Sequence, residues 1–473
     1  MNLLHIIPRF IGGGPERHLL ALASAWRTSG FQVRQRIVVL DPPASAPLLI
    51  KARRLGIELL IAPDPATLRS AIAAADIVEI RFWNHPRLYE LLRQDLPPAR
   101  RLLSSAIAGT TLPQVLTAEI GGVADAMVLS TEASWRTPAV AEAQARGCRI
   151  ESIPSLADMS RLAGFTPRPH DGIRVGYLGL VEPTKMHPRF AELSSAVKTK
   201  GVQFDIYGGG AWREHLQQRF DQAGMSDRVR FHGQVEDIRT AFAEMDIFGY
   251  PLAPDTSATS EKTIQEAMWV GIPPVVLAGT GASPMVRHEI TGLICESESD
   301  YPRAIERLAE DDVLRRRLGE AAREFAREHF EPDRNAARFR HLFESLPALP
   351  KREIVPLPGL DEPGAQRFVR SLGSLGVDFE ASFQGIPVTS ATNLAAAERS
   401  IRHSSPVLTQ GEGGIVHYRN TYPQDPHLNL WCGLISLHAR NDTAAHREFD
   451  EAIRCGLDPG RVQPHLTPSS DVH

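Results

Sequence analysis

The stretch from Ala258 to Val276, ATSEKTIQEAMWVGIPPVV, places two carboxylates, Glu261 and Glu266, at a loop and a short predicted helix. Ser260 is positioned to cap this helix, and Gly271 ends it before an apolar strand over 272–277. Glu266 lies in an apolar context, so its carboxylate needs partners, and ribose hydroxyls would serve. The stretch therefore predicts a helix whose N-terminal end binds a ligand. The alternative is a structural glutamate with partners inside the fold.

Three glycine clusters follow predicted strands, at 12–14, 176–179 and 208–210. Glycine permits positive φ and lets a ligand approach the backbone closely. The helix predicted after the first cluster offers free N–H groups to an anion. None of the clusters has the GxGxxG spacing of a dinucleotide site, so we do not expect a nicotinamide enzyme. The alternative is that the glycines serve packing alone.

Lys185 lies six residues beyond Gly179 and is predicted at the start of a helix facing a cleft. A cation is unfavourable at the positive end of a helix unless a phosphate binds there. A solvent-facing lysine is the alternative. His85 follows the strand predicted over 76–82 and, with Arg81, is a second candidate for chemistry. For His85 the alternative is a helix-start histidine without a chemical role.

Alternating strands and helices must position these residues. Residues 1–153 predict one α/β domain and residues 172–330 a second, joined by a Pro- and Gly-containing linker. Parallel βαβ units place loops at the carboxyl ends of the strands, so two such domains imply a cleft between them. A charged helix over 331–348 is predicted to return toward the first domain. The predicted fold class is α/β, with two Rossmann-like domains and a mostly helical C-terminal extension.

The C-terminal part is less regular. Residues 349–420 are rich in Gly, Ser and Pro and predict no definite structure. Residues 421–473 predict a helical hairpin whose spacing resembles a tetratricopeptide unit. A single unit of this kind cannot bury its own apolar face, so we expect it to pack on the rest of the chain or on a protein partner.

Composition bounds the function class. The chain has 473 residues, a net charge of -4 and four scattered cysteines. These values give no indication of nucleic-acid binding, a metal-binding cysteine set or disulfides. The sequence has neither a signal peptide nor a run long enough to cross a bilayer, so we expect a cytoplasmic protein. The basic residues 51–54 allow at most peripheral contact with the inner membrane face.

Several segments together resemble one family. GGGPERHLLALA, GYLGLVEPTKMHP, RVRFHGQVEDIRTAFAEMDIFGYP and EAMWVGIPPVV followed by ITGLI are similar to segments of retaining GT-B glycosyltransferases of family 4. The resemblance covers roughly residues 1–345. It implies a GT-B fold, a nucleotide-sugar donor and no metal or other cofactor.

The resemblance also implies roles for individual residues. Glu266 would bind the donor ribose, and Lys185 the diphosphate. The other residues expected to line the donor site are Gly13, Gly14, Gly179, Gly208, Gly209, Glu261 and Thr263. The candidates for catalysis are Lys185, Glu261 and His85.

Three positions depart from the family pattern. The first glutamate of its E-x7-E motif falls on Ala258, and Glu261 is the nearby substitute. A phosphate-binding arginine falls on Leu180, and a histidine near the donor sugar falls on Ala106. Losing one such contact costs a few kcal/mol of transition-state stabilisation.

These observations lead to a prediction and two alternatives. The prediction is a glycosyltransferase that uses a UDP- or GDP-linked sugar and a glycan, lipid-linked or protein acceptor, with retention. The first alternative is a catalytically impaired relative that binds a nucleotide sugar or a partner. The second, an epimerase on the same fold, has no residue set to support it.

Overall fold

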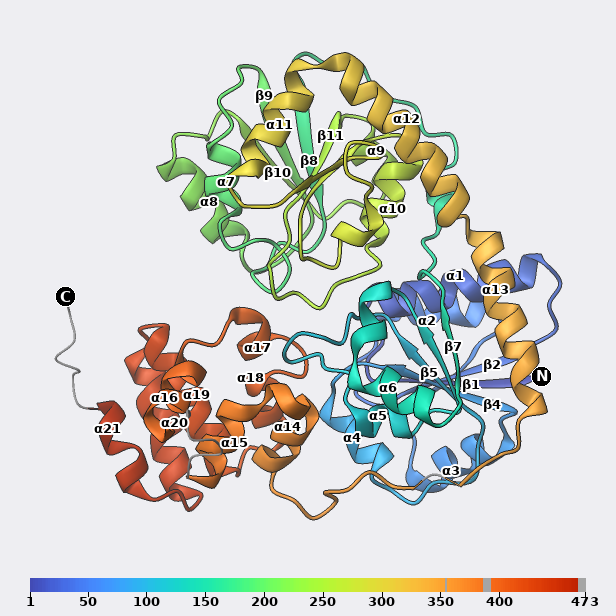
Figure 1. The fold of residues 1–473 in the computed structure, drawn as a ribbon, viewed down its shortest axis with the longest axis vertical. Coiled ribbons are helices and arrows are strands. Elements are labelled where there is room, and N and C mark those ends of the chain that lie inside the picture. The colour runs from blue at the N-terminus through green and yellow to red at the C-terminus, as the bar shows by residue number, and fades with distance from the viewer. Residues whose placement is uncertain (354, 386–392, 467–473) are drawn as a thin grey trace.

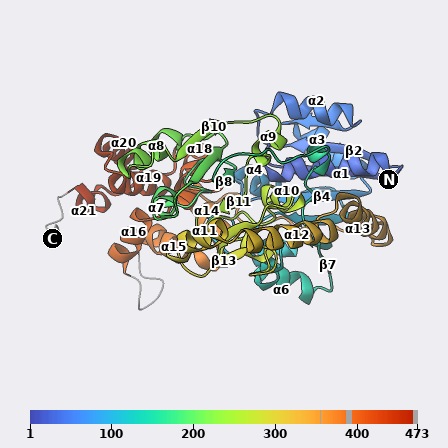
Figure 2. The same cartoon turned by 90° about the horizontal axis from the view of Figure 1, so that it is seen from above.

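The computed structural model describes residues 1–353, 355–385 and 393–466. Figure 1 shows three bodies: two α/β domains, one above the other, and a helical extension beside the first domain. The view from above places the extension at the end opposite the N-terminus (Figure 2). The predicted fold class is therefore confirmed.

The first domain is built on a parallel seven-stranded sheet in the order β3-β2-β1-β4-β5-β6-β7. Its strands are β1 Asn2–Ile7, β2 Arg34–Val39, β3 Glu58–Ile61, β4 Ile77–Phe82, β5 Arg101–Ser105, β6 Ala126–Leu129 and β7 Arg149–Ser152. Its helices are α1 Gly14–Thr28, α2 Ala46–Arg54, α3 Pro65–Ala74, α4 Pro86–Leu92, α5 Ala118–Gly122 and α6 Pro138–Ala145. The central strands are buried on both faces and are mostly apolar, and their polar members His5, Glu79 and Arg81 bond to one another.

The second domain has a parallel six-stranded sheet in the order β10-β9-β8-β11-β12-β13. Its strands are β8 Ile173–Leu178, β9 Val202–Tyr207, β10 Val229–Gly233, β11 Ile247–Tyr250, β12 Pro274–Leu277 and β13 Leu293–Cys295. Its helices are α7 Phe190–Ser195, α8 Arg213–Gln222, α9 Ile238–Phe242, α10 Lys262–Trp269, α11 Asp300–Glu310 and α12 Asp312–His329.

The chain passes between the domains twice. The segment predicted as a linker, 154–172, contains a short 3-10 helix, Met159–Leu162, with both end residues buried. After α12 the chain returns as α13, Pro332–Ser345, which packs on α1 of the first domain (Figure 1). The Trp26 indole donates to the carbonyl of Ala336 at 2.9 Å, so α13 is tied to the first domain.

Residues 349–420, for which the sequence predicted no definite structure, form helices where they are described. The extension consists of α14 Gly364–Leu372, α15 Val377–Gln384, α16 Leu394–Arg402, α17 Pro406–Gln410, α18 Ile415–Thr421, α19 Pro426–His438, α20 Asp442–Arg454 and α21 Gln463–Leu466. The helices are short and separated by glycines and prolines, which is why no clear periodicity marks them in the sequence.

The predicted hairpin is α19 and α20, and part of 421–473 lies outside the described residues. Its apolar face is covered by the extension itself, since Trp431 is fully buried against Phe368 and Phe379. This packing removes the reason for expecting a protein partner on that face. Among the described residues, no helix combines the length and apolar composition needed to cross a bilayer.

Candidate donor-binding site

The candidate residues gather where the strand order of each sheet reverses. β1 lies between β2 and β4, and β8 lies between β9 and β11. Loops that leave adjacent parallel strands in opposite directions open a crevice at the carboxyl ends of those strands. The glycine turn 12–14 follows β1, the Lys185 turn follows β8, and the loop to Glu261 follows β11. The topology therefore brings these three segments to the cleft between the domains.

Lys185 and Glu261 form a largely buried ion pair, with Nζ 2.8 Å from Oε2. The phenol of Tyr250, at the end of β11, donates to the same carboxylate oxygen at 2.7 Å. Burial opposes ionisation of Glu261, but the Lys185 ammonium and the phenol outweigh it and hold the pKa of this carboxyl below its usual range. Burial likewise opposes the charge on Lys185, but Glu261 raises its pKa. Both groups are therefore charged at neutral pH.

Lys185 does not start a helix, contrary to the sequence prediction. It lies in a turn, and α7 begins only at Phe190. The turn is fixed to the end of β11 by the amide of Ala253, which donates to the Lys185 carbonyl at 2.8 Å. Lys185 is thus positioned by the loop after β11, and its charge is balanced by Glu261.

Glu266 is buried within α10, with 4% of its surface exposed. Burial raises the pKa of its carboxyl to about 7, even though Arg161 lies 3.6 Å away and favours ionisation. No side chain of α10 donates a hydrogen bond to the Glu266 carboxyl, whereas the Tyr250 phenol donates one to Glu261. A ligand hydroxyl would supply the missing donor, as predicted for Glu266.

Ser260 does not cap α10, contrary to the sequence prediction. The N-cap residue is Glu261, and no side chain accepts a hydrogen bond from the first turn. Ser260 Oγ instead accepts from the Ser155 amide and from Gln265 Nε2, both at 3.1 Å. The first turn of α10 therefore has no side-chain cap, and it contains Thr263, whose hydroxyl faces the phenol of Tyr250.

The glycine turns face this helix start. A Cβ on Gly14 would lie 3.6 Å from Nζ of Lys262, which reaches from the second domain to the turn in the first. In that turn Gly12, rather than Gly13 or Gly14, has the positive φ, +109°. In the second domain Gly208 has φ +141°, and a Cβ there would meet the Gly179 carbonyl at 1.7 Å. Gly209 has open space around its Cα.

Three cations near the site were not singled out in the sequence: Arg17, Arg161 and Lys262. Burial lowers the pKa of Lys262 to about 8 although Glu261 opposes the change. Arg17, in the first turn of α1, acts electrostatically on Lys185 and Glu266. Arg17 and Lys262 stand beside Gly14 and Glu261, so adjacency to those motifs was the available signal, whereas Arg161 lies in the linker and had none. With Lys185 they place four cations near Glu261 and Glu266, and Glu16 and Asp158 are two further carboxylates within electrostatic range.

Two of the three departures from the family pattern, Ala106 and Ala258, lie close together. Thr259 Oγ1 donates to the Ala106 carbonyl at 2.7 Å, and Ile107 pairs with Ala258 in an antiparallel bridge. Ala106 and Ala258 thus lie where the two domains touch. Leu180 is 45% exposed, and its carbonyl accepts from the phenol of Tyr177 at 2.8 Å. Its side chain therefore has room to be replaced by a longer one.

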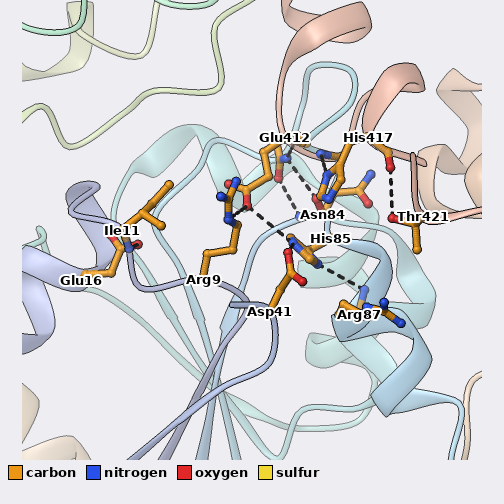
Figure 3. A network of polar contacts seen from close by, with 12 residues as sticks. Arg9, Ile11, Glu16, Asp41, Asn84, His85, Arg87, Glu412, His417 and Thr421 are labelled. Atoms are coloured by element: carbon orange, nitrogen blue, oxygen red, sulfur yellow. Dashed lines mark hydrogen bonds and ion pairs between the residues drawn. The ribbon is translucent and has the colours of Figure 1, made fainter. Parts of the chain in front are cut away.

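His85 belongs to a different group of residues. It is the N-cap of α4, and its contacts are with Asp41, Glu412 and His417 rather than with Lys185 or Glu261 (Figure 3). Asp41, His85 and His417 offer ligand atoms within 4.8 Å of one another, the only such group in the described part of the chain. Both imidazoles, however, accept backbone N–H bonds at Nδ1, from Arg87 and Gly413. A neutral ring then carries its proton on Nε2, which suits donation better than metal ligation.

Comparisons with known proteins agree with this architecture. Residues 161–325 match the family described as Glycosyl transferases group 1. A lipopolysaccharide core biosynthesis glycosyltransferase, LpsE of Rhizobium meliloti, is 28% identical over 134 residues, covering 28% of this chain and 38% of that protein. A GDP-mannose-dependent alpha-mannosyltransferase of Mycolicibacterium smegmatis is 27% identical over 279 residues, covering 50% and 71%.

Among solved structures, Anabaena HepE in complex with UDP and glucose superposes with a TM-score of 0.58 at 16% identity. The alignment covers 73% of this chain and all of HepE. At such identity the likeness concerns the fold alone. The two α/β domains therefore have the GT-B fold, and the second of them carries the glycosyl transferases group 1 segment.

Proposed function

We propose that this protein is a glycosyltransferase that moves a sugar from a nucleotide-sugar donor to an acceptor. The observation that carries the proposal is the buried Lys185–Glu261 pair beside Glu266, with Lys262 reaching across to the glycine turn. Several cations at a cleft lined by glycine turns suit a diphosphate, and a buried carboxyl whose nearest cation, Arg161, lies beyond hydrogen-bond distance suits a ribose.

Donor binding would redistribute charge at Lys185. The diphosphate competes with Glu261 for the ammonium, and the Tyr250 phenol continues to hold the carboxylate. Lys185 and Lys262 stabilise the negative charge that grows on the leaving diphosphate. Because the site is desolvated, each contact is worth more than it would be in water. This arrangement needs no metal and no other cofactor.

We also propose that transfer proceeds with retention. The bond from the anomeric carbon to the phosphate oxygen breaks while a bond to the acceptor oxygen forms on the same face. The leaving phosphate oxygen takes the acceptor proton. The family 4 resemblance supports this step.

The test is incubation of the full chain with a panel of UDP-, GDP- and dTDP-sugars. The expected result is release of nucleoside diphosphate with at least one donor, abolished in Lys185→Ala and Glu266→Ala. The relatives' names make GDP-mannose and UDP-glucose the first donors to try. Thermal stabilisation by a donor without turnover of any donor would contradict the proposal.

That outcome would instead support a binding protein without transferase activity. The observation in its favour is that Ala106 and Ala258, where polar groups are expected, lie at a direct contact between the domains. Turnover decides between the two functions, since both predict donor binding.

Acceptor and location follow as proposals. Relatives named for lipopolysaccharide core synthesis and mannosyl transfer favour a glycan or lipid-linked acceptor over a protein. Four free thiols favour the reducing cytoplasm. Contact with the inner membrane face would be peripheral, through the basic end of α2.

A further inference from the structure

The extension is fixed against the first domain at several points, among them the glycine loop 411–414. Gly413, with φ +80°, lies so close to the Asn84 backbone that a Cβ would meet its carbonyl at 2.3 Å. Gln114 Nε2 donates to the Glu412 carbonyl at 2.6 Å. The Tyr418 phenol donates to Asn84 Oδ1 at 3.0 Å, and Asn84 Nδ2 donates to Ser371 Oγ at 3.1 Å. These bonds give Glu412 and His417 defined positions above the sheet.

The loop completes a group of five polar residues, here called the extension-side cluster: Arg9, Asp41, His85, Glu412 and His417 (Figure 3). The first three follow β1, β2 and β4, and the other two come from the extension. The side chain of His85 is 1% exposed, whereas those of Arg9, Asp41 and Glu412 are 26–33% exposed. The cluster thus has a buried floor and walls that reach solvent.

Polar atoms in the cluster face one another without bonding. His85 Nε2 lies 3.6 Å from Asp41 Oδ2 and 3.7 Å from Glu412 Oε1, and Arg9 Nε lies 3.8 Å from Glu412 Oε1. All three distances exceed a hydrogen bond. Arg9 Nε, His85 Nε2 and Glu412 Oε1 are buried and have no partner. Leaving such atoms unpaired costs about 1–3 kcal/mol each, so a ligand that satisfies them is favoured.

The chemistry of these atoms selects the ligand. His85 and His417 accept at Nδ1 and therefore present N–H donors at Nε2. Asp41 and Glu412 present acceptors. An anion would face two carboxylates, and a cation would find protonated ring nitrogens. A hydroxyl both donates and accepts, so neighbouring hydroxyls of a sugar ring match this mixture.

The imidazole rings of His85 and His417 remain neutral N–H donors over a wide pH range. Burial, with His417 and Arg9 nearby, lowers the pKa of His85 to about 2. Burial also lowers the pKa of His417 to about 4, although Asp41 opposes the change. Burial raises the pKa of Glu412 to about 7. The cluster therefore carries little net charge at neutral pH.

The extension-side cluster adjoins the candidate donor site. Glu412 acts electrostatically on Glu16, which follows the glycine turn in α1, and Glu16 in turn interacts with Lys262. The Ile11 amide, just before the glycine turn, donates to Glu16 Oε1 at 3.4 Å. Both groups of residues lie at the carboxyl ends of the strands.

We propose that the extension completes a saccharide-binding subsite, in which Glu412 and His417 close over Asp41 and His85 and bind vicinal hydroxyls of a pyranose ring. As a subsite for the acceptor, it rests on the proposed glycosyl transfer. Glu412 and His417 would then be specificity residues supplied by a part of the chain outside the two α/β domains.

The test is direct binding, which needs no turnover. Saturation-transfer difference NMR on the full chain would use methyl α-mannopyranoside, methyl β-glucopyranoside and methyl β-galactopyranoside as probes. At least one glycoside should give a signal that falls fivefold or more in Glu412→Gln and His417→Gln. The matched control is His446→Gln, an exposed histidine of α20, which should change nothing.

Three outcomes would overturn the subsite: no signal for any glycoside with the wild-type chain, an undiminished signal in both variants, or Zn²⁺ binding that the same variants abolish. If a variant of the extension unfolds, Asp41→Asn on the first domain is the substitute, and it should lower the glycoside signal in the same way. Failure of donor turnover with intact glycoside binding would count against the proposed transferase alone. Donor turnover without glycoside binding would count against the subsite alone.

Discussion

The two polar groups of the cleft differ in how far the protein satisfies them. At the donor side Lys185 and Glu261 satisfy each other, and Tyr250 completes the set. In the extension-side cluster three buried atoms remain unpaired. In the first arrangement, the Lys185 ammonium would exchange its partner Glu261 for a diphosphate. The second leaves hydrogen-bonding capacity for a neutral ligand. Under the two proposals, the cleft would hold two ligands of different charge.

The largest effect is expected from breaking the charge pair. Lys185→Ala removes the diphosphate cation and leaves Glu261 buried without its partner. Donor-dependent release of nucleoside diphosphate should fall on the order of 10²–10³-fold. Stability should also fall, by about 2–3 kcal/mol in urea unfolding, since Lys185 is partly exposed.

A double variant separates these two losses. Lys185→Met with Glu261→Gln removes both charges and should recover most of the stability without recovering turnover. Recovery of turnover would mean that Lys185 acts on the fold and not on the donor.

The next largest effect is expected from a substitution that weakens the attachment of the extension to the first domain without altering a charge. Asn84→Ala removes the bonds to Pro113, Ser371 and Tyr418 and should cost about 1–3 kcal/mol. Glycoside signals should drop severalfold while thermal stabilisation by a donor persists. Asn441→Ala, which removes the N-cap of α20, is the matched control: it should cost about 1 kcal/mol and leave glycoside binding intact.

Glu266 and Glu261 should respond to pH in opposite directions. Glu266 has a raised pKa, about 7 against 4.5, so its ionisation destabilises the fold. The cost is absent below about pH 4.5 and grows to about 3 kcal/mol as pH rises through 7. Glu266→Gln should therefore stabilise the free protein at pH 8 and weaken donor binding about tenfold.

Glu261, with its lowered pKa, contributes stability above its unfolded pKa that is lost as pH falls. Glu261→Gln should accordingly destabilise at neutral pH. Urea unfolding of Glu266→Gln at pH 5 and pH 8, and of Glu261→Gln at pH 3 and pH 5, measures the contrast. Parallel pH profiles for the two would contradict the distinction between a satisfied and an unsatisfied carboxyl.

The smallest effect is expected at Leu180. Leu180→Arg adds a cation where the family pattern has one, on a side chain that is 45% exposed. Stability should change by less than about 0.5 kcal/mol. Donor affinity, measured by titration calorimetry with UDP and GDP, should rise up to about tenfold. Unchanged affinity would place the diphosphate away from the Gly179 turn.

The sequence predicted the fold class because short, largely apolar strands alternate with helices along both domains. It predicted that Lys185 and Glu266 line the cleft. Lys185 follows a glycine turn, and Glu266 lies in a short helix that follows a polar loop. It misjudged the cap of α10 and the setting of Lys185, since both depend on contacts with distant segments, Ser155 and Ala253. The extension-side cluster was out of reach for the same reason. Its members lie on three strand ends and a glycine loop far along the chain, and only His85 was noticed.

The packing of α13 on α1 has a mechanical consequence. Since α13 and the extension are both attached to the first domain, the chain itself joins the second domain to the first through residues 154–172 and 330–332. The other links between the two domains are non-covalent, such as the bond from Thr259 Oγ1 to the Ala106 carbonyl. A rotation of the second domain about the two crossings would break such bonds and carry Lys185 and Glu261 together. The residues of the extension-side cluster would keep their relative positions, because all of them belong to the first domain and the extension.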